Sequence, residues 1–272
     1  MNNQKHVQVD RRSNLTVAEF RREYLLPGRP VVITDCMKDW DTGLLSFDGL
    51  KAHCGDEEVL LYHYDREKEF TPGDVTRRPL GEVIDGIRDA DFRTYPYYMR
   101  DNWQLADKYT ELMDAHSVPG YFFDWFRFLP PALRMPYPRI FIGPKGAVTP
   151  LHVDVWGTHA WLSQLEGRKR WLLFSPSDMQ YLYDCNVRCE DPDLERHPDY
   201  VKATAHEAVI EPGDTIFAPS RWAHWVESLE SGLSLTYNYM GPGCFASCLG
   251  NTASDVAARL ARRMRGNKLA EA

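Results

Sequence analysis

Residues 149–174 read TPLHVDVWGTHAWLSQLEGRKRWLLF, and this stretch carries the pattern that decides the fold. Two apolar runs within it, 160–165 and 169–174, are separated by Gly167, as expected for two short strands joined by a turn. Similar short runs occur on either side of this stretch, at 139–143, 208–210, 215–218 and 233–239. Regular short strands divided by Pro and Gly turns predict a β-sandwich or jelly roll.

The first half of the chain mixes helix and strand patterns. Asn14 or Thr16 can cap a short amphipathic helix that ends before Pro27-Gly28. The remaining elements expected here are strands at 29–34, 58–64 and 95–99, a helix at 80–87 and an aromatic-rich helical segment at 103–128. Near the C-terminus, residues 254–265 predict a helix with one apolar stripe, which can pack on the chain's own core or on a second copy.

Length and composition limit the class of protein. A chain of 272 residues predicts one domain, with N-terminal helices and strands over 1–135, a β core over 136–245 and the C-terminal helix within 246–272. The formal net charge of -7 argues against nucleic acid as a partner. No apolar run approaches the roughly 20 residues of a membrane span, and the polar start predicts a cytoplasmic protein.

The six cysteines are expected to be reduced. Cys185 with Cys189 and Cys244 with Cys248 share a C-x-x-x-C spacing, so a structural zinc bound by four thiolates stays open.

Three residues suggest a metal centre. His152 and Asp154 are two apart, so in a strand their side chains share one face. Downstream, the turn and strand of residues 211–219 lead into Trp222-Ala223-His224, which can deliver a second imidazole to the mouth of a barrel. Two histidines and one carboxylate with an open opposite face are typical of non-haem Fe(II) oxygenases.

These motifs together resemble the Jumonji-C (JmjC), cupin-like family of Fe(II)- and 2-oxoglutarate-dependent oxygenases. The similarity rests on residues 149–174, Pro212-Gly213-Asp214, Trp222-Ala223-His224 and, near the N-terminus, 29–33 with Lys38-Asp39-Trp40. It covers about residues 15 to 245. The resemblance implies a mostly β fold with flanking helices: a double-stranded β-helix (jelly roll/cupin) core, N-terminal α/β elements and a C-terminal helix.

The resemblance also implies residue roles. The implied iron ligands are His152, Asp154 and His224. The residues implied to surround 2-oxoglutarate are Lys169, Thr149, Tyr98, Thr236 and Asn238, of which Lys169 pairs with the distal carboxylate. Leu162 departs from the family pattern, because similar hydroxylases place an asparagine near the cofactor at this point. His159 is an extra imidazole, expected to be structural because the open metal face must receive cosubstrate and oxygen.

The implied activity is hydroxylation of a C–H bond in an amino-acid side chain of a protein, peptide or free amino acid, using Fe(II), 2-oxoglutarate and O2 and releasing succinate and CO2. Asp154 favours hydroxylation, because many demethylases have Glu there. The aromatic candidates for the substrate pocket are Tyr95, Tyr97, Trp156, Trp161, Trp222 and Trp225. The apolar stripe and the family's dimers predict a homodimer through the C-terminal helix. A metal enzyme independent of 2-oxoglutarate, and a catalytically silent binding module, stay open as alternatives.

Overall fold

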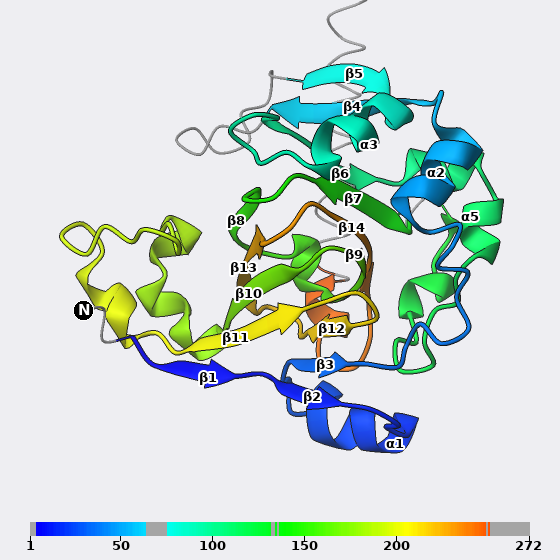
Figure 1. Ribbon diagram of the computed structural model, residues 1–272. Coiled ribbons are helices and arrows are strands. Elements are labelled where there is room, and N and C mark those ends of the chain that lie inside the picture. Colours follow the sequence, from blue (N-terminus) through cyan, green and yellow to red (C-terminus); the bar gives the residue numbers. More distant parts are fainter. Residues whose placement is uncertain (1–3, 64–74, 132–133, 135, 249, 251–272) are drawn as a thin grey trace, which may run out of the picture.

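Two facing β-sheets form the centre of the computed structural model, which describes residues 4–63, 75–131, 134, 136–248 and 250 (Figure 1). The strands are β1 (His6–Gln8), β2 (Asp10–Arg12), β3 (Val31–Ile33), β4 (Glu58–His63), β5 (Val75–Pro79), β6 (Tyr97–Asn102), β7 (Arg139–Gly143), β8 (Val148–Val153), β9 (His159–Glu166), β10 (Lys169–Phe174), β11 (Ala205–Ile210), β12 (Thr215–Ala218), β13 (Ala223–Ser228) and β14 (Gly232–Tyr239). The α-helices are α1 (Val17–Phe20), α2 (Phe47–Cys54), α3 (Leu80–Arg88), α4 (Gln104–Lys108) and α5 (Glu111–Asp114).

The strand order is that of a double-stranded β-helix extended at its edges. One sheet has the order β1-β11-β10-β13-β8, and the other has the order β2-β3-β12-β9-β14-β7-β6-β4-β5. The inner pairs of both sheets, including β10 with β13 and β9 with β14, are antiparallel. The predicted jelly-roll core is therefore confirmed, and α2, α3 and α5 lie to one side of it, around the larger sheet (Figure 1).

Alternation along β9 separates the inside of the β-helix from its outer core. Ala160 and Leu162 face the space between the sheets, whereas Trp161 points the other way and is 1% exposed. The Trp161 ring stacks on Phe122 at 5.2 Å and on Tyr237 at 4.7 Å between ring centroids. Burial of a large aromatic side chain contributes about 2–3 kcal/mol. This outer packing fixes which face of β9 lines the interior.

A single N-terminal segment closes one edge of both sheets. β1 pairs in parallel with β11, and β2 pairs in parallel with β3. Arg11, within β2, donates to both carboxylate oxygens of Asp214 at 2.8 Å. Asp214 is buried and also accepts the backbone N–H of Glu211, so the turn between β11 and β12 is tied to this segment. Figure 1 shows β1 and β2 running along the lower edge of the molecule.

Several local predictions need correction. Thr16, not Asn14, caps α1, through a reciprocal pair of bonds with Glu19. Residues 103–128 are not one helical segment: they form α4, α5 and a 3-10 turn at Trp125–Phe128, and Pro119-Gly120 lies in the non-helical stretch between α5 and that turn. The strand expected at 95–99 begins at Tyr97, just after Pro96.

The helix expected at 254–265 lies outside the described residues. No helix within the described ranges is long and apolar enough to cross a membrane.

Candidate active site

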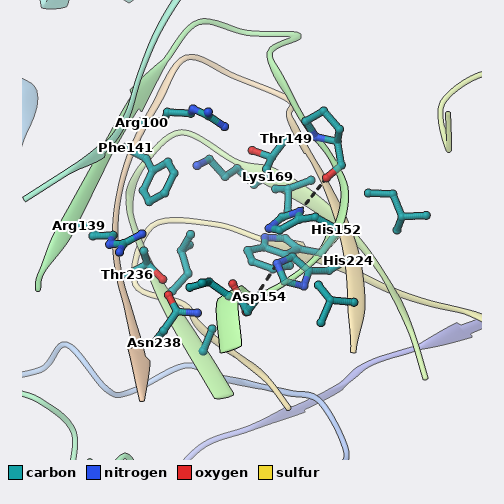
Figure 2. Close-up of a pocket in the computed structure, with 18 of the residues that line it drawn as sticks. Arg100, Arg139, Phe141, Thr149, His152, Asp154, Lys169, His224, Thr236 and Asn238 are labelled. Carbon is teal, nitrogen blue, oxygen red and sulfur yellow. Dashed lines mark hydrogen bonds and ion pairs between the residues drawn. The ribbon is translucent and has the colours of Figure 1, made fainter. Parts of the chain in front are cut away.

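A cavity of about 750 Å³ lies between the two sheets and brings the sequence-predicted residues together. One wall comes from β8, β10 and β13, and the opposite wall comes from β9, β14, β7 and β6. The residues that line it are Tyr98, Arg100, Arg139, Phe141, Thr149, Pro150, Leu151, His152, Val153, Asp154, Val155, Ala160, Leu162, Lys169, Trp171, His224, Val226, Thr236 and Asn238. Figure 2 shows the labelled side chains directed into this space.

Three of these side chains form a cluster that can hold a metal ion. His152 and His224 are direct cross-strand partners on β8 and β13, and their ring centroids are 4.3 Å apart. Asp154 follows β8 rather than lying within it, and its Oδ2 is 4.0 Å from Nε2 of His224. One ligand atom from each of the three lies within 4.8 Å of the other two. Within the described residues this is the one such group of three or more His, Cys, Asp or Glu.

Backbone carbonyls orient both imidazoles. Nδ1 of His152 is 2.7 Å from the carbonyl oxygen of Pro150, and Nδ1 of His224 is 3.2 Å from that of Trp222. Because a carbonyl can only accept, each Nδ1 carries the proton and donates it. The lone pair of each neutral ring is therefore on Nε2, which is the arrangement that metal-binding histidines need.

The surroundings of His224 keep it neutral. It is 4% exposed, and burial, followed by the neighbouring His152, lowers the pKa of His224 below its ordinary value. The Trp171 ring stacks on the His224 ring at 5.4 Å with an interplanar angle of 26°. A buried, neutral imidazole oriented by a carbonyl and an indole is in the protonation state that metal binding by histidine requires.

Lys169 provides a buried cation in the same cavity. It is 3% exposed, and burial alone lowers its pKa from 10.5 to about 7. No acidic side chain within the described residues contributes to that shift, and the nearest aromatic contact of Nζ is the Phe141 ring at 5.7 Å. A buried ammonium group needs a counter-charge. An anionic ligand that enters the cavity can supply it.

The other predicted residues also line the cavity. Thr149 lies on β8 on the Lys169 side, whereas Thr236 and Asn238 lie on β14 (Figure 2). Thr236 Oγ1 donates to the Trp161 carbonyl at 2.7 Å, and Asn238 Nδ2 donates to Thr158 Oγ1 at 3.0 Å.

Tyr98 and Leu162, which the sequence also singled out, contribute a packed aromatic ring and an apolar side chain to the cavity wall. Tyr98 is buried, with its ring centroid 6.2 Å from that of Phe141. A Cβ on Gly143 would lie 2.5 Å from Cδ2 of Tyr98, so only glycine leaves room for this ring. Leu162 lies beside Thr236 and gives this part of the wall an apolar surface.

Sequence reasoning missed four of the polar or aromatic side chains that line the cavity, Arg100, Arg139, Phe141 and Trp171. None of the six aromatic candidates is among the described residues that line the cavity. Trp161 and Trp225, for example, point to the opposite face of their strands and are 1% exposed. Arg100 lies two residues from the predicted Tyr98 on β6, and Trp171 lies two residues from the predicted Lys169 on β10. Strand parity was therefore the signal that could have found Arg100 and Trp171, whereas Arg139 and Phe141 depend on the register of β7 against β14.

The remaining candidates are structural. All six cysteines are free, and the two C-x-x-x-C pairs belong to separate apolar clusters, so they do not form one four-thiolate zinc site. His159 is 2% exposed and does not line the cavity. Its Nδ1 accepts from the Ser220 N–H at 2.9 Å, and its Nε2 donates to the Pro242 carbonyl at 2.8 Å.

Comparison with known proteins gives a consistent picture. The profile of a family described as cupin-like domain matches residues 17–242. The chain is 30% identical over 260 residues to the Gallus gallus protein named 2-oxoglutarate and iron-dependent oxygenase JMJD4, covering 87% of this chain and 60% of that protein. It is 26% identical over 257 residues to the Arabidopsis thaliana protein named arginine-specific demethylase JMJ20, covering 83% and 55%.

A third relative is the Caenorhabditis elegans protein named bifunctional arginine demethylase and lysyl-hydroxylase psr-1. It is 29% identical over 250 residues, covering 84% of this chain and 59% of that protein. The chain thus spans at most 60% of the length of these relatives.

Proposed function

Because the chain belongs to the cupin-like domain family, we propose that it is an Fe(II)- and 2-oxoglutarate-dependent hydroxylase of an amino-acid side chain. One observation carries the proposal. Both histidines donate Nδ1–H to backbone carbonyls, so two Nε2 lone pairs and the Asp154 carboxylate converge at one point of an open cavity. Two imidazoles and one carboxylate form the facial set that suits non-haem Fe(II).

The residues present fit both iron and 2-oxoglutarate. His152, Asp154 and His224 would hold the metal, and Lys169 would bind the distal carboxylate of 2-oxoglutarate. The buried ammonium of Lys169, without an acidic partner among the described residues, supports this role. Thr149 and Tyr98, which also line the cavity, would add hydroxyl groups to this binding site. Iron held there would supply the oxidation by O2, in which 2-oxoglutarate becomes succinate and CO2 and one oxygen atom is inserted into a substrate C–H bond.

The protein's own contribution is orientation and exclusion of water. Trp171 stacks on the ring of His224, and Leu162, Val226 and Phe141 give the cavity apolar surface. In such surroundings the attraction between Lys169 and a carboxylate is stronger than it is in water. The cavity would hold the substrate with one C–H bond near the metal. Such orientation of the substrate is the main contribution of a protein to the reaction of a reactive cofactor.

The proposed substrate is a side chain in a protein, peptide or free amino acid. Two relatives are named for lysyl hydroxylation and arginine demethylation, and these names support an amino-acid side chain as the substrate. Asp154, in place of the glutamate of many demethylases, supports hydroxylation rather than demethylation.

The test is anaerobic loading with Fe(II), followed by O2 and 2-oxoglutarate and measurement of succinate. We expect succinate from the wild type, loss of it in His152→Ala, and retention in the control His53→Ala, which changes a histidine outside the cavity. No succinate from the wild type, together with no 2-oxoglutarate binding by calorimetry, would refute the proposal. That result would favour the two alternatives, a catalytically silent binding module and a metal enzyme that works without 2-oxoglutarate.

Three further properties belong to the same proposal. The chain is one domain from 1 to 272, with a β core over 136–245. It forms a homodimer through residues 254–265, and a light-scattering mass of 31.4 kDa, that of one chain, would reject this. Its six free thiols support a cytoplasmic location, because reducing compartments keep cysteines unpaired.

A further inference from the structure

We propose that Thr236 and Asn238 select the substrate, by accepting hydrogen bonds from a side chain that ends in nitrogen with two or more protons. Primary amides, ammonium groups and guanidinium groups are such ends. The inference rests on the proposed function and names its substrate class. It starts from the wall formed by β14, where both residues line the cavity.

Hydrogen bonds within the protein fix the orientation of the Asn238 amide. The hydroxyl of Thr158 donates to the carbonyl oxygen of Val155 at 3.1 Å, so its proton is already used. The Thr158 oxygen can therefore only accept from Asn238, and it accepts from Nδ2 at 3.0 Å. Because the amide nitrogen is held on this side, Oδ1 of Asn238 lies on the other side as a fixed acceptor.

Thr236 presents an acceptor for the same reason. Its hydroxyl donates to the Trp161 carbonyl at 2.7 Å, which leaves only the lone pairs of Oγ1. Among the described residues, no hydrogen bond is donated to Oγ1 of Thr236 or to Oδ1 of Asn238. Thr236 is 9% exposed and Asn238 6% exposed, so a ligand that covers this acceptor pair must supply donors or leave it unpaired at a cost.

Strand register separates the acceptor pair from the end of the cavity that contains Lys169. The Phe141 ring, 5.7 Å from Nζ of Lys169, belongs to the cross-strand partner of Ser234 on β14. Thr236 and Asn238 are two and four residues further along that strand, which is roughly 7 and 13 Å at about 3.3 Å per residue. The pair is thus outside the reach of a carboxylate bound to Lys169.

The acceptor pair faces the metal end of the cavity instead. Thr158, which anchors Asn238, is bonded to the carbonyl of the residue after Asp154. Figure 2 shows the pair toward Asp154 and away from Lys169. Ionised 2-oxoglutarate has two carboxylates and a ketone, all of them acceptors, so the donors are left to the substrate. This assignment departs from the expectation that both residues surround 2-oxoglutarate, and the variants below decide between the two.

The number of acceptors decides among the possible donors. Residues two apart on one face of a strand are roughly 7 Å apart at the backbone, and each N–H···O bond spans about 2.9 Å. A nitrogen with two or more protons can donate to both oxygens from between them, whereas a hydroxyl has a single proton and can satisfy only one. The pair thus favours an amide, ammonium or guanidinium end over a hydroxyl, a carboxylate or an alkyl end.

The probes are amino acids blocked as the N-acetyl N-methylamide, grouped so that only the end of the side chain differs. Glutamine is compared with methionine, asparagine with leucine, and lysine and arginine with norleucine. Threonine against valine tests a hydroxyl. Binding is measured by anaerobic calorimetry on protein loaded with Fe(II) and 2-oxoglutarate, and a gain of one oxygen is then sought by mass spectrometry after O2 is added.

We expect at least one nitrogen probe to bind about 5- to 100-fold more tightly than its partner, the range for leaving a buried acceptor unpaired, and threonine to gain less over valine. Asn238→Ala should remove most of this preference, and Thr236→Val, which keeps the shape of the side chain, should remove part of it. Both variants should still bind 2-oxoglutarate, which shows that they are folded. The control Asn186→Ala changes an exposed asparagine outside the cavity and should behave as the wild type.

Three outcomes would overturn the inference. The first is equal or absent binding of every nitrogen probe relative to its partner, in wild-type protein that binds 2-oxoglutarate. The second is a gain for threonine over valine as large as that of the nitrogen probes. The third is an Asn238→Ala variant that loses 2-oxoglutarate but keeps the probe preference, since Asn238 would then serve the cosubstrate. Wild-type protein that neither binds 2-oxoglutarate nor forms succinate rejects the proposed function instead.

Discussion

Replacing Lys169 with methionine should make the ligand-free protein more stable while removing the proposed anchor for 2-oxoglutarate. Lys169 is buried in the cavity wall, and burial lowers its pKa from 10.5 to about 7. At roughly 1.4 kcal/mol per pH unit, this difference corresponds to a cost of about 5 kcal/mol. The Lys169 ammonium also makes a cation–π contact with the Phe141 ring at 5.7 Å. Contacts of this kind contribute about 1–2 kcal/mol, so this one offsets only part of the cost of burial. Methionine has a similar length and no charge to bury.

The pH dependence follows from the sign of this shift. Between about pH 7 and 10.5 the unfolded chain holds the lysine proton and the folded chain has released it, so wild-type stability rises with pH over this window. Below pH 7 both states are protonated and the full cost applies. Lys169→Met should therefore raise the free energy of unfolding by about 3–5 kcal/mol at pH 7, a gain that falls below about 1 kcal/mol near pH 10.

Urea unfolding at pH 7, 8, 9 and 10 measures the effect, with Lys202→Met as the control. Lys202 is exposed and pairs with Asp199, so its loss should change stability by less than about 1 kcal/mol at every pH. Calorimetry at pH 8 supplies a second reading: wild type should take up about one proton on binding 2-oxoglutarate, because the carboxylate restores the charge of Lys169. A variant less stable than wild type, or one that binds 2-oxoglutarate equally well, would refute the reasoning.

Three further predictions concern the metal cluster and the wall behind it. Asp154→Asn should lower Fe(II) affinity by more than about 100-fold, which exceeds the usual effect of losing a residue that only hydrogen-bonds a metal ligand. Equilibrium dialysis measures this affinity, and an unchanged value would show that Asp154 is not a ligand. Burial lowers the pKa of His224, so on acidification this imidazole is protonated at a higher pH in the unfolded chain than in the folded one. The free energy of unfolding should therefore fall as the pH drops below about 6.5, and His224→Gln should flatten that decline in urea titrations. Gly143→Ala should cost about 1–3 kcal/mol, because the new Cβ meets the Tyr98 ring at 2.5 Å; a thermal unfolding midpoint equal to that of wild type would contradict this.

Local patterns were enough to predict much of the fold. The strands expected at 139–143, 169–174 and 215–218 have those limits in the structure, because short β-branched and aromatic runs between turn residues leave little choice of boundary. The resemblance to the JmjC family is confirmed by the family match over residues 17–242. The prediction of one helical segment over 103–128 was wrong. Its apolar and aromatic residues suggested a helix, whereas Pro119-Gly120 prevents a single helix from spanning the segment.

The cavity lining could be predicted only in part. His152, Asp154 and His224 were recognisable because their spacing carries a known chemistry. Arg139 was not, since its position depends on pairing with Thr236, far away in the chain, and no local pattern states that register. Trp161 was assigned to the pocket by residue type alone, although the small Ala160 and the apolar Leu162 beside it mark the other face of β9.

The N-terminal segment that edges both sheets has a consequence for how the molecule is made. β1 pairs with β11, so about 200 residues are synthesised between this strand and its partner. Contacts this distant form slowly, since a long loop must close first. Until β1 docks, the edge of β11 presents unpaired backbone groups, which are templates for pairing with another chain. Docking of β1 is therefore expected to be a late step of folding, and a truncated chain that lacks residues 6–12 should depend on chaperones to stay unaggregated.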